Sequence, residues 1–177
     1  MITLLLGGAR SGKSALAVAL AMEHGGAVTY IATSPRIEGD DDLDRRVATH
    51  RAERPSHWRT IEEEHDLATA LSAAGDDLVV VDCLTLWVSN LMWHGGDDAG
   101  IVQSAELDSA AAAAREAPTI VVSNEVGLGV HPSSEAGRRY RDVLGRVNAI
   151  WSTAADRALL LVAGRAIDLV DPKTLLR

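Results

Sequence analysis

Eight residues near the amino terminus have the types and spacing of a phosphate-binding loop. The segment Gly7-Gly8-Ala9-Arg10-Ser11-Gly12-Lys13-Ser14 fits the pattern G-x-x-x-x-G-K-[ST] in full, between an apolar run and an apolar helical segment. Gly7 and Gly12 allow backbone angles that a Cβ disfavours, so successive amide N–H groups can converge on one anion. Lys13 would supply a cation to the β- and γ-phosphates, and the Ser14 hydroxyl would ligate Mg²⁺. A glycine turn that binds nothing is the weaker interpretation, because the whole octet and both flanks match.

A carboxylate, Asp82, follows the apolar run Leu78–Val81. A carboxylate at the end of a buried strand is the usual second anchor for Mg²⁺ in P-loop enzymes. The alternative is that Asp82 caps the helical segment Leu84–Trp93. The presence of the P-loop favours a metal or nucleotide role.

The segment Arg45–Pro55 holds four arginines and one histidine, although the chain as a whole carries a formal charge of −8. On a helix, Arg46, His50 and Arg54 would share one face, and Pro55 would end that helix. Such a basic stripe could hold a triphosphate while the imidazole attacks it. The residues alone leave a second interpretation open, in which the arginines form a solvated face and offset the neighbouring aspartates.

Apolar runs alternate with longer helical segments along the whole chain. Runs that are largely apolar at consecutive positions, and not only at alternate ones, suit strands buried on both faces, and five occur, at Ile2–Leu6, Val28–Ala32, Leu78–Val81, Thr119–Ser123 and Ala158–Ala163. The helical segments are Lys13–His24, Leu43–Arg54, Asp66–Ala74, Leu84–Trp93, Ala105–Glu116 and Ala136–Thr153, and Pro35–Asp42 and Gly95–Gly100 are expected loops. This order predicts an α/β fold, a single P-loop NTPase-like domain over residues 1–177 with a mostly parallel sheet and helices on both faces.

Composition limits the possible functions and partners. The 177 residues are 47% hydrophobic and 24% charged, as in ordinary globular domains, and the four tryptophans Trp58, Trp87, Trp93 and Trp151 are expected in the core. An acidic chain is a poor candidate for binding nucleic acid. The single cysteine gives no sign of an oxidising compartment, and the first apolar run is too short for a membrane span or signal peptide, so we expect a cytoplasmic protein. No histidine or cysteine pair has zinc-site spacing.

Several phrases resemble one family, the bifunctional adenosylcobinamide kinase / adenosylcobinamide-phosphate guanylyltransferases of cobalamin biosynthesis. They are the P-loop octet, Tyr30-Ile31-Ala32-Thr33-Ser34, His50-Arg51-Ala52-Glu53-Arg54-Pro55-Ser56-His57-Trp58-Arg59-Thr60, Ser123-Asn124-Glu125-Val126-Gly127-Leu128-Gly129 and Gly145-Arg146-Val147-Asn148. The resemblance covers Met1 to about Ala163. The phrase that begins at His50 is its most specific part, because many families share the P-loop.

The resemblance implies both a chemistry and its residues. A γ-phosphoryl group from ATP or GTP passes to a hydroxyl of adenosylcobinamide, with Mg²⁺ held at Ser14 and Asp82. His50 then attacks the α-phosphorus of GTP, and the GMP passes to adenosylcobinamide phosphate. Lys13 and His50 are the implied catalytic residues, and the implied nucleotide contacts are Gly7–Ser14, Ala32, Thr33, Ser34, Arg51, Ala52, Glu53, Arg54, Glu62 and Asp82. A homotrimer with active sites near subunit interfaces is also implied.

The sequence departs from the family pattern at two of these positions. Thr49-His50 stands where family members often carry His-His, and the retained histidine matches the nucleophile. Asp82 stands where some members carry Glu, so the carboxylate has a shorter stem.

Other functions are weighed against this one. A small-molecule kinase without nucleotidyl transfer would leave His50 without a task, and a guanine-binding switch would need an Asn-Lys-x-Asp phrase that the chain lacks. The loop Asn124–Gly129 fits a ligand loop and a subunit contact about equally well.

Overall fold

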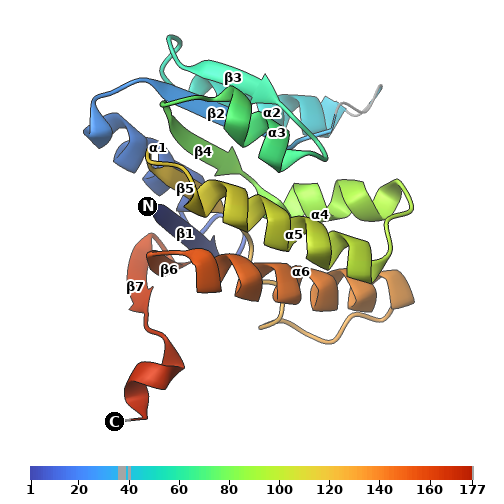
Figure 1. The fold of residues 1–177 in the computed structure, drawn as a ribbon. Coiled ribbons are helices and arrows are strands. Elements are labelled where there is room, and N and C mark those ends of the chain that lie inside the picture. The colour runs from blue at the N-terminus through green and yellow to red at the C-terminus, as the bar shows by residue number, and fades with distance from the viewer. Residues whose placement is uncertain (36–38, 40, 177) are drawn as a thin grey trace.

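The computed structural model describes residues 1–35, 39 and 41–176, without the side chains at 41–44, 46 and 50. In this part of the chain one seven-stranded sheet has the order β3-β2-β4-β5-β1-β6-β7, with helices on both faces (Figure 1). Neighbouring strands are parallel, except that β6 and β7 are antiparallel. The predicted α/β fold with a mostly parallel sheet is therefore confirmed.

The five predicted strands form the middle of the sheet. Most of their side chains are buried, on both faces of the sheet, which explains why these segments are largely apolar in the sequence. They are β1 (Ile2–Gly7), β2 (Val28–Ala32), β4 (Leu78–Asp82), β5 (Thr119–Val122) and β6 (Arg157–Val162). The two edge strands, β3 (Arg59–Glu62) and β7 (Arg165–Leu169), were not predicted, because their largely exposed side chains leave no apolar run in the sequence.

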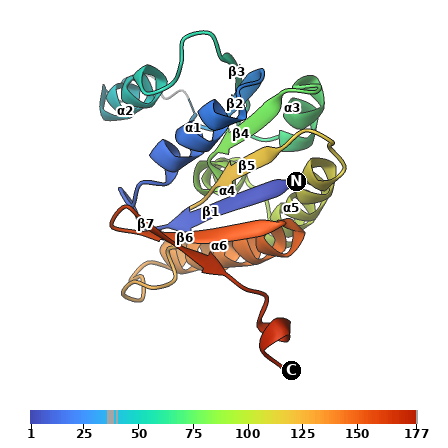
Figure 2. The ribbon, with the colours of Figure 1, turned by 90° about the vertical axis from the view of Figure 1, so that its left-hand side faces the viewer.

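Two core clusters lie on opposite faces of the sheet. Ala17 and Ala21 of α1 pack on one face with Tyr30, while Trp87 and Trp151 are fully buried on the other, which α3, α5 and α6 cover (Figures 1 and 2). Trp93 is 88% exposed at the last position of α4, so its expected place in the core was wrong. The helices are α1 (Lys13–His24), α2 (Asp41–Ala52), α3 (Leu67–Ala73), α4 (Leu84–Trp93), α5 (Asp98–Ala113) and α6 (Glu135–Ala154), followed by a 3₁₀ turn, η1 (Pro172–Leu175).

Among the helix boundaries that differ from the prediction are the start of α5 and the end of α2. α5 begins at Asp98, inside the expected loop Gly95–Gly100, because the Asp97 carboxylate accepts the N–H of Gly100 at 2.7 Å and caps the helix there. α2 ends at Ala52, so Arg54 lies beyond it, and the predicted common helix face of Arg46, His50 and Arg54 was wrong for Arg54. The α conformation is disfavoured before a proline, here Pro55, which ends the helix early.

Part of the expected loop Pro35–Asp42 lies outside the described residues, and α2 already begins at Asp41. No helix among the described residues is long and apolar enough to cross a membrane. In Figure 2, α2 projects past the sheet at the edge where β1 runs into the P-loop, whereas the other helices pack against a face.

Candidate functional site

The P-loop connects the end of β1 to the start of α1. Gly7 has φ 152° and Gly12 φ 101°, and Arg10 also has a positive φ, 57°. A Cβ on Gly7 would collide with the carbonyl oxygen of Leu161 and stand 2.7 Å from Ser11 Oγ, so only glycine fits there. Both glycines therefore have the positive backbone angles that the sequence predicted. Such alternation of backbone angles turns amide N–H groups towards one centre, and α1 adds the positive end of its dipole.

Lys13 lies inside this loop and is only 6% exposed. Its ammonium group donates to the carbonyl oxygens of Gly7 at 3.0 Å and Gly8 at 2.7 Å. Burial lowers the pKa of Lys13, and the nearby Cys83 and Asp82 partly oppose that change. A phosphate oxygen would replace these carbonyl partners with a charged one, so the loop is already shaped around the position of an anion.

The strand register brings predicted nucleotide contacts into one row. Ala32 is level with Glu62 on β3 and with Asp82 on β4. The N–H of Thr33 then donates to the carbonyl of Asp82 at 3.1 Å, and the N–H of Glu63 donates to that of Ala32 at 3.0 Å. Residues far apart in the sequence therefore meet at the carboxyl-terminal edge of the sheet, next to the P-loop strand and β5.

The Thr33-Ser34 segment is held by side-chain bonds. Thr33 Oγ1 donates to the carbonyl of Cys83 and accepts its N–H, both at 2.7 Å. Asn90 Nδ2 donates to the carbonyl of Thr33 at 2.8 Å. The next hydroxyl, Ser34 Oγ, is buried and has no hydrogen-bond partner in the described part of the chain, as expected of a group that contacts a bound ligand.

Asp82 is the last residue of β4. Its Oδ2 accepts the phenol of Tyr30 at 2.5 Å, and the pKa of Tyr30 is raised by burial and then by this carboxylate. The alternative that Asp82 caps α4 was wrong, because the N-cap is Cys83 and no side chain caps that end. Burial and Asp82 also raise the pKa of the Cys83 thiol to about 12, so it stays protonated.

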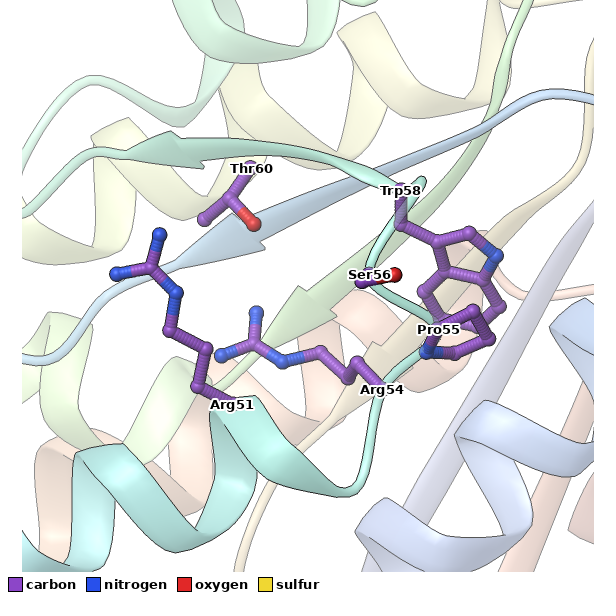
Figure 3. A pocket seen from close by; sticks show the side chains of 6 residues that line it. All are labelled: Arg51, Arg54, Pro55, Ser56, Trp58 and Thr60. Carbon is purple, nitrogen blue, oxygen red and sulfur yellow. The ribbon is translucent and has the colours of Figure 1, made fainter.

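Two arginines line one pocket: Arg51 lies in the last turn of α2, and Arg54 follows that helix. The Arg54 guanidinium carbon lies 3.8 Å from the centroid of the Tyr30 ring, a cation–π contact. Figure 3 shows the Arg51 and Arg54 side chains extended beside each other, with Thr60 nearby. A pair of guanidinium groups suits an anionic ligand such as a phosphate. The lining residues are Arg51, Arg54, Pro55, Ser56, Trp58 and Thr60.

The predicted nucleophile, His50, lies on the backbone of α2, but its side chain is outside the described residues, as is that of Arg46. The structure therefore does not place the imidazole relative to the P-loop. Of the other predicted contacts, Arg51, Ala52 and Glu53 are exposed at this end of α2.

Sequence reasoning missed three residues that build this site: Tyr30, Cys83 and Asn90. Tyr30 joins Arg54 to Asp82, and the other two fix Thr33. The phenol of Tyr30 in a largely apolar strand was the available signal. The bonds to Thr33 depend on register, which the sequence does not show.

Comparison with known proteins gives a family and two relatives. Residues 3–169 match the family model described as cobinamide kinase / cobinamide phosphate guanyltransferase. The bifunctional adenosylcobalamin biosynthesis protein CobP of Pseudomonas aeruginosa is 45% identical over 173 residues, 96% of this chain and 97% of that protein. The bifunctional adenosylcobalamin biosynthesis protein CobU of Escherichia coli is 38% identical over 183 residues, 96% of this chain and 99% of that protein.

A solved structure supports the fold. An ATPase from the type III secretion system of pathogenic bacteria superposes with a TM-score of 0.55 at 13% identity, over 99% of this chain and 60% of that one. At this identity the similarity concerns the fold alone, and it agrees with the predicted P-loop NTPase-like architecture.

Proposed function

The chain belongs to the cobinamide kinase / cobinamide phosphate guanyltransferase family, and we propose that it carries out both reactions on adenosylcobinamide in cobalamin biosynthesis. The observation that carries the proposal is the buried Lys13 inside a complete P-loop, at the sheet edge that also holds Asp82 and the Ala32–Ser34 segment. In the kinase step, a substrate hydroxyl attacks the γ-phosphorus of ATP or GTP. Lys13 and the loop amides stabilise the charge on the transferring group.

We propose the nucleotide contacts that the resemblance to this family implies. The P-loop amides and Ser34 Oγ would bind the nucleotide beside Asp82, and Arg51 and Arg54 would bind its phosphates from the pocket in Figure 3. The Ser34 hydroxyl, which has no partner among the described residues, and the neighbouring Arg51 and Arg54 side chains support this assignment. The remaining proposed contacts are Ala32, Thr33, Ala52, Glu53 and Glu62.

Ser14 and Asp82 would hold Mg²⁺. A hydroxyl and a carboxylate are the hard oxygen donors that this ion prefers, and Tyr30 occupies only one carboxylate oxygen of Asp82, Oδ2. When bound, the ion neutralises charge on the phosphates.

In the second step His50 is the proposed nucleophile. Its imidazole nitrogen forms a bond to the α-phosphorus of GTP while the bond to pyrophosphate breaks, and pyrophosphate leaves with that electron pair. A phosphate oxygen of adenosylcobinamide phosphate then attacks the same phosphorus and releases the imidazole. Imidazole is substantially neutral near pH 7, which leaves its lone pair available.

We also propose that residues 1–177 form one domain, that three copies assemble as a homotrimer, and that the protein works in the cytoplasm. The projecting position of α2 supports the trimer, because a helix that packs on no face of its own sheet can approach a neighbouring subunit (Figure 2). Sedimentation velocity tests the assembly, and a monomer at micromolar concentration would contradict it.

A covalent-adduct assay tests the nucleotidyl-transfer half. The protein is incubated with Mg²⁺ and GTP labelled at the α-phosphate, and acid-labile label on the protein is measured. His50→Ala should abolish the adduct. The matched control is His24→Ala, because His24 is exposed at the far end of α1. A wild-type protein that takes no label, while it phosphorylates adenosylcobinamide, would support the alternative of a kinase without nucleotidyl transfer.

A further inference from the structure

The loop after β5 begins between two parts of the candidate site. These are the P-loop, which follows β1, and Asp82, which ends β4. β5 pairs with β1 on one side and with β4 on the other. Its last residue, Val122, is level with Leu5 and with Asp82. The residues that follow therefore leave the sheet between the P-loop and Asp82, where the transferred phosphoryl group would lie.

Each of the first three residues of this loop donates a hydrogen bond from its backbone N–H. Ser123 N–H donates to a β1 carbonyl, Asn124 N–H to a hydroxyl at the start of α4, and Glu125 N–H to the first residue of the P-loop. These acceptors are Leu5 O at 2.9 Å, Thr85 Oγ1 at 2.9 Å and Gly7 O at 3.1 Å.

The side chain of Asn148, on α6, forms hydrogen bonds with Ser123 and Asn124 of the same loop. It is only 5% exposed, its Oδ1 accepts the Ser123 hydroxyl at 2.6 Å, and its Nδ2 donates to the carbonyl of Asn124 at 3.0 Å. The backbone of Glu125 is therefore fixed against Gly7, and its side chain starts beside the phosphate-binding loop.

We propose that Glu125 is the general base of the phosphoryl-transfer step, an inference that rests on the proposed kinase function. The carboxylate takes the proton of the attacking hydroxyl as its oxygen forms a bond to the γ-phosphorus. The bond from that phosphorus to the β–γ bridging oxygen breaks, and a nucleoside diphosphate leaves with the electron pair. Neither an oxidant nor a further reactant is required.

Glu125 suits this task better than Asp82 does. Asp82 already accepts a hydrogen bond from the Tyr30 phenol. Its negative charge also stabilises the charged form of Lys13. Glu125 Oε1 accepts the N–H of Gly127 in its own exposed loop at 2.5 Å, and Oε2 accepts no hydrogen bond from any residue that the structure describes. A half-buried carboxylate with an oxygen available can meet a substrate hydroxyl.

The test compares Glu125→Gln with wild type in both reactions. Glutamine keeps the shape and can accept the Gly127 N–H but cannot take a proton, so kcat of the kinase step should fall about 100-fold or more. The KM values, nucleotide affinity and formation of the GMP adduct should be unchanged, and Glu125→Asp should recover part of kcat. Glu116→Gln is the control, because Glu116 is exposed in the connection between α5 and β5, before the opposite end of that strand.

Two results would overturn the inference, and they are distinct from failure of the proposed function. An undiminished kcat in Glu125→Gln, with wild type active, contradicts the role of Glu125 alone. If Glu125→Gln impairs only KM or nucleotide affinity, Glu125 is a binding residue, and this result also contradicts its role as general base. Wild type that never phosphorylates adenosylcobinamide contradicts the kinase function itself, and the inference with it.

Discussion

The P-loop and α2 stand at the same edge of the sheet but are constructed differently. Around the P-loop, Lys13 and Ser11 are buried, and the P-loop is hydrogen-bonded to the loop after β5 and to the turn after β6. On α2, the described side chains are exposed, and the helix projects beyond the sheet (Figure 2). The core of the domain therefore stabilises the phosphate site, whereas the described side chains of α2, the helix that carries His50, add no buried apolar surface.

Tyr30 connects the two regions. Its ring packs under the Arg54 guanidinium, and its hydroxyl bonds to Asp82. A phosphate bound by Arg54 would thus be coupled through one aromatic side chain to the carboxylate next to the P-loop. The P-loop is thus part of the packed core, whereas the described side chains of α2 lie outside it.

Gly7→Ala tests the assembled region and should have the largest effect. The new Cβ would meet the backbone of β6 at Leu161, and φ 152° is strained for alanine, so the loop must shift. A displacement of about 1 Å costs on the order of 100-fold in rate, and we expect at least that loss in kcat/KM of the kinase step. Adduct formation should fall as well, because in the proposed function the P-loop amides also bind the phosphates of GTP.

Gly145→Ala is the matched control for this substitution. Gly145 is exposed within α6, nothing lies within 4 Å of the added Cβ, and alanine favours the helix by roughly 1 kcal/mol. Kinase assays and thermal unfolding of both variants give the measurement. A fully active Gly7→Ala enzyme would show that the loop is not shaped in advance.

Arg54→Ala tests the second region and should have a smaller, selective effect. The substitution removes a guanidinium from the pocket and the contact with Tyr30. The rate of GMP-adduct formation should fall about tenfold, the loss expected for roughly 1.4 kcal/mol of transition-state binding, and the kinase step should change much less. Arg54→Lys keeps a charge but not the planar group, so it should recover only part of the rate.

Arg165→Ala serves as the control for Arg54, because Arg165 is exposed on the edge strand β7. Single-turnover measurements of each reaction separate the two effects. Equal losses in both reactions would contradict the division between the two regions and would make Arg54 part of the kinase site.

The same division separates what the sequence could predict from what it could not. The octet at Gly7–Ser14 and the apolar strands follow from local rules, because glycine angles and continuous burial leave local patterns. Tyr30 and Asn148 act through partners 52 and 24 to 25 residues away, which only the register and packing bring together. The end of α2 was misplaced by two residues because the effect of Pro55 reaches back along the chain.

Asp108 lies away from both regions and should affect stability without changing activity. It is 4% exposed where α5 packs on α3, Oδ1 accepts the N–H of Ala68 at 3.0 Å, and Oδ2 is buried without a partner among the described residues. Burial raises the pKa of Asp108 to about 7. The unfolded chain has an ordinary carboxyl pKa near 4, so folding favours the protonated form.

The sign of the pH effect follows from that difference. Between about pH 4 and pH 7 the unfolded chain loses the Asp108 proton while the folded chain keeps it, so this residue lowers the free energy of unfolding as pH rises. Asp108→Asn removes the buried charge and should raise the free energy of unfolding at pH 8, relative to wild type, by on the order of 1–2 kcal/mol. At pH 5 the gain should largely vanish, because wild-type Asp108 is then protonated in the folded state.

Urea unfolding at the two pH values measures this difference, with Asp76→Asn, at an exposed turn residue, as control. A gain of equal size at both pH values would show that packing, and not the buried charge, sets the cost of Asp108, while altered kinase or adduct rates would place α5 within the site.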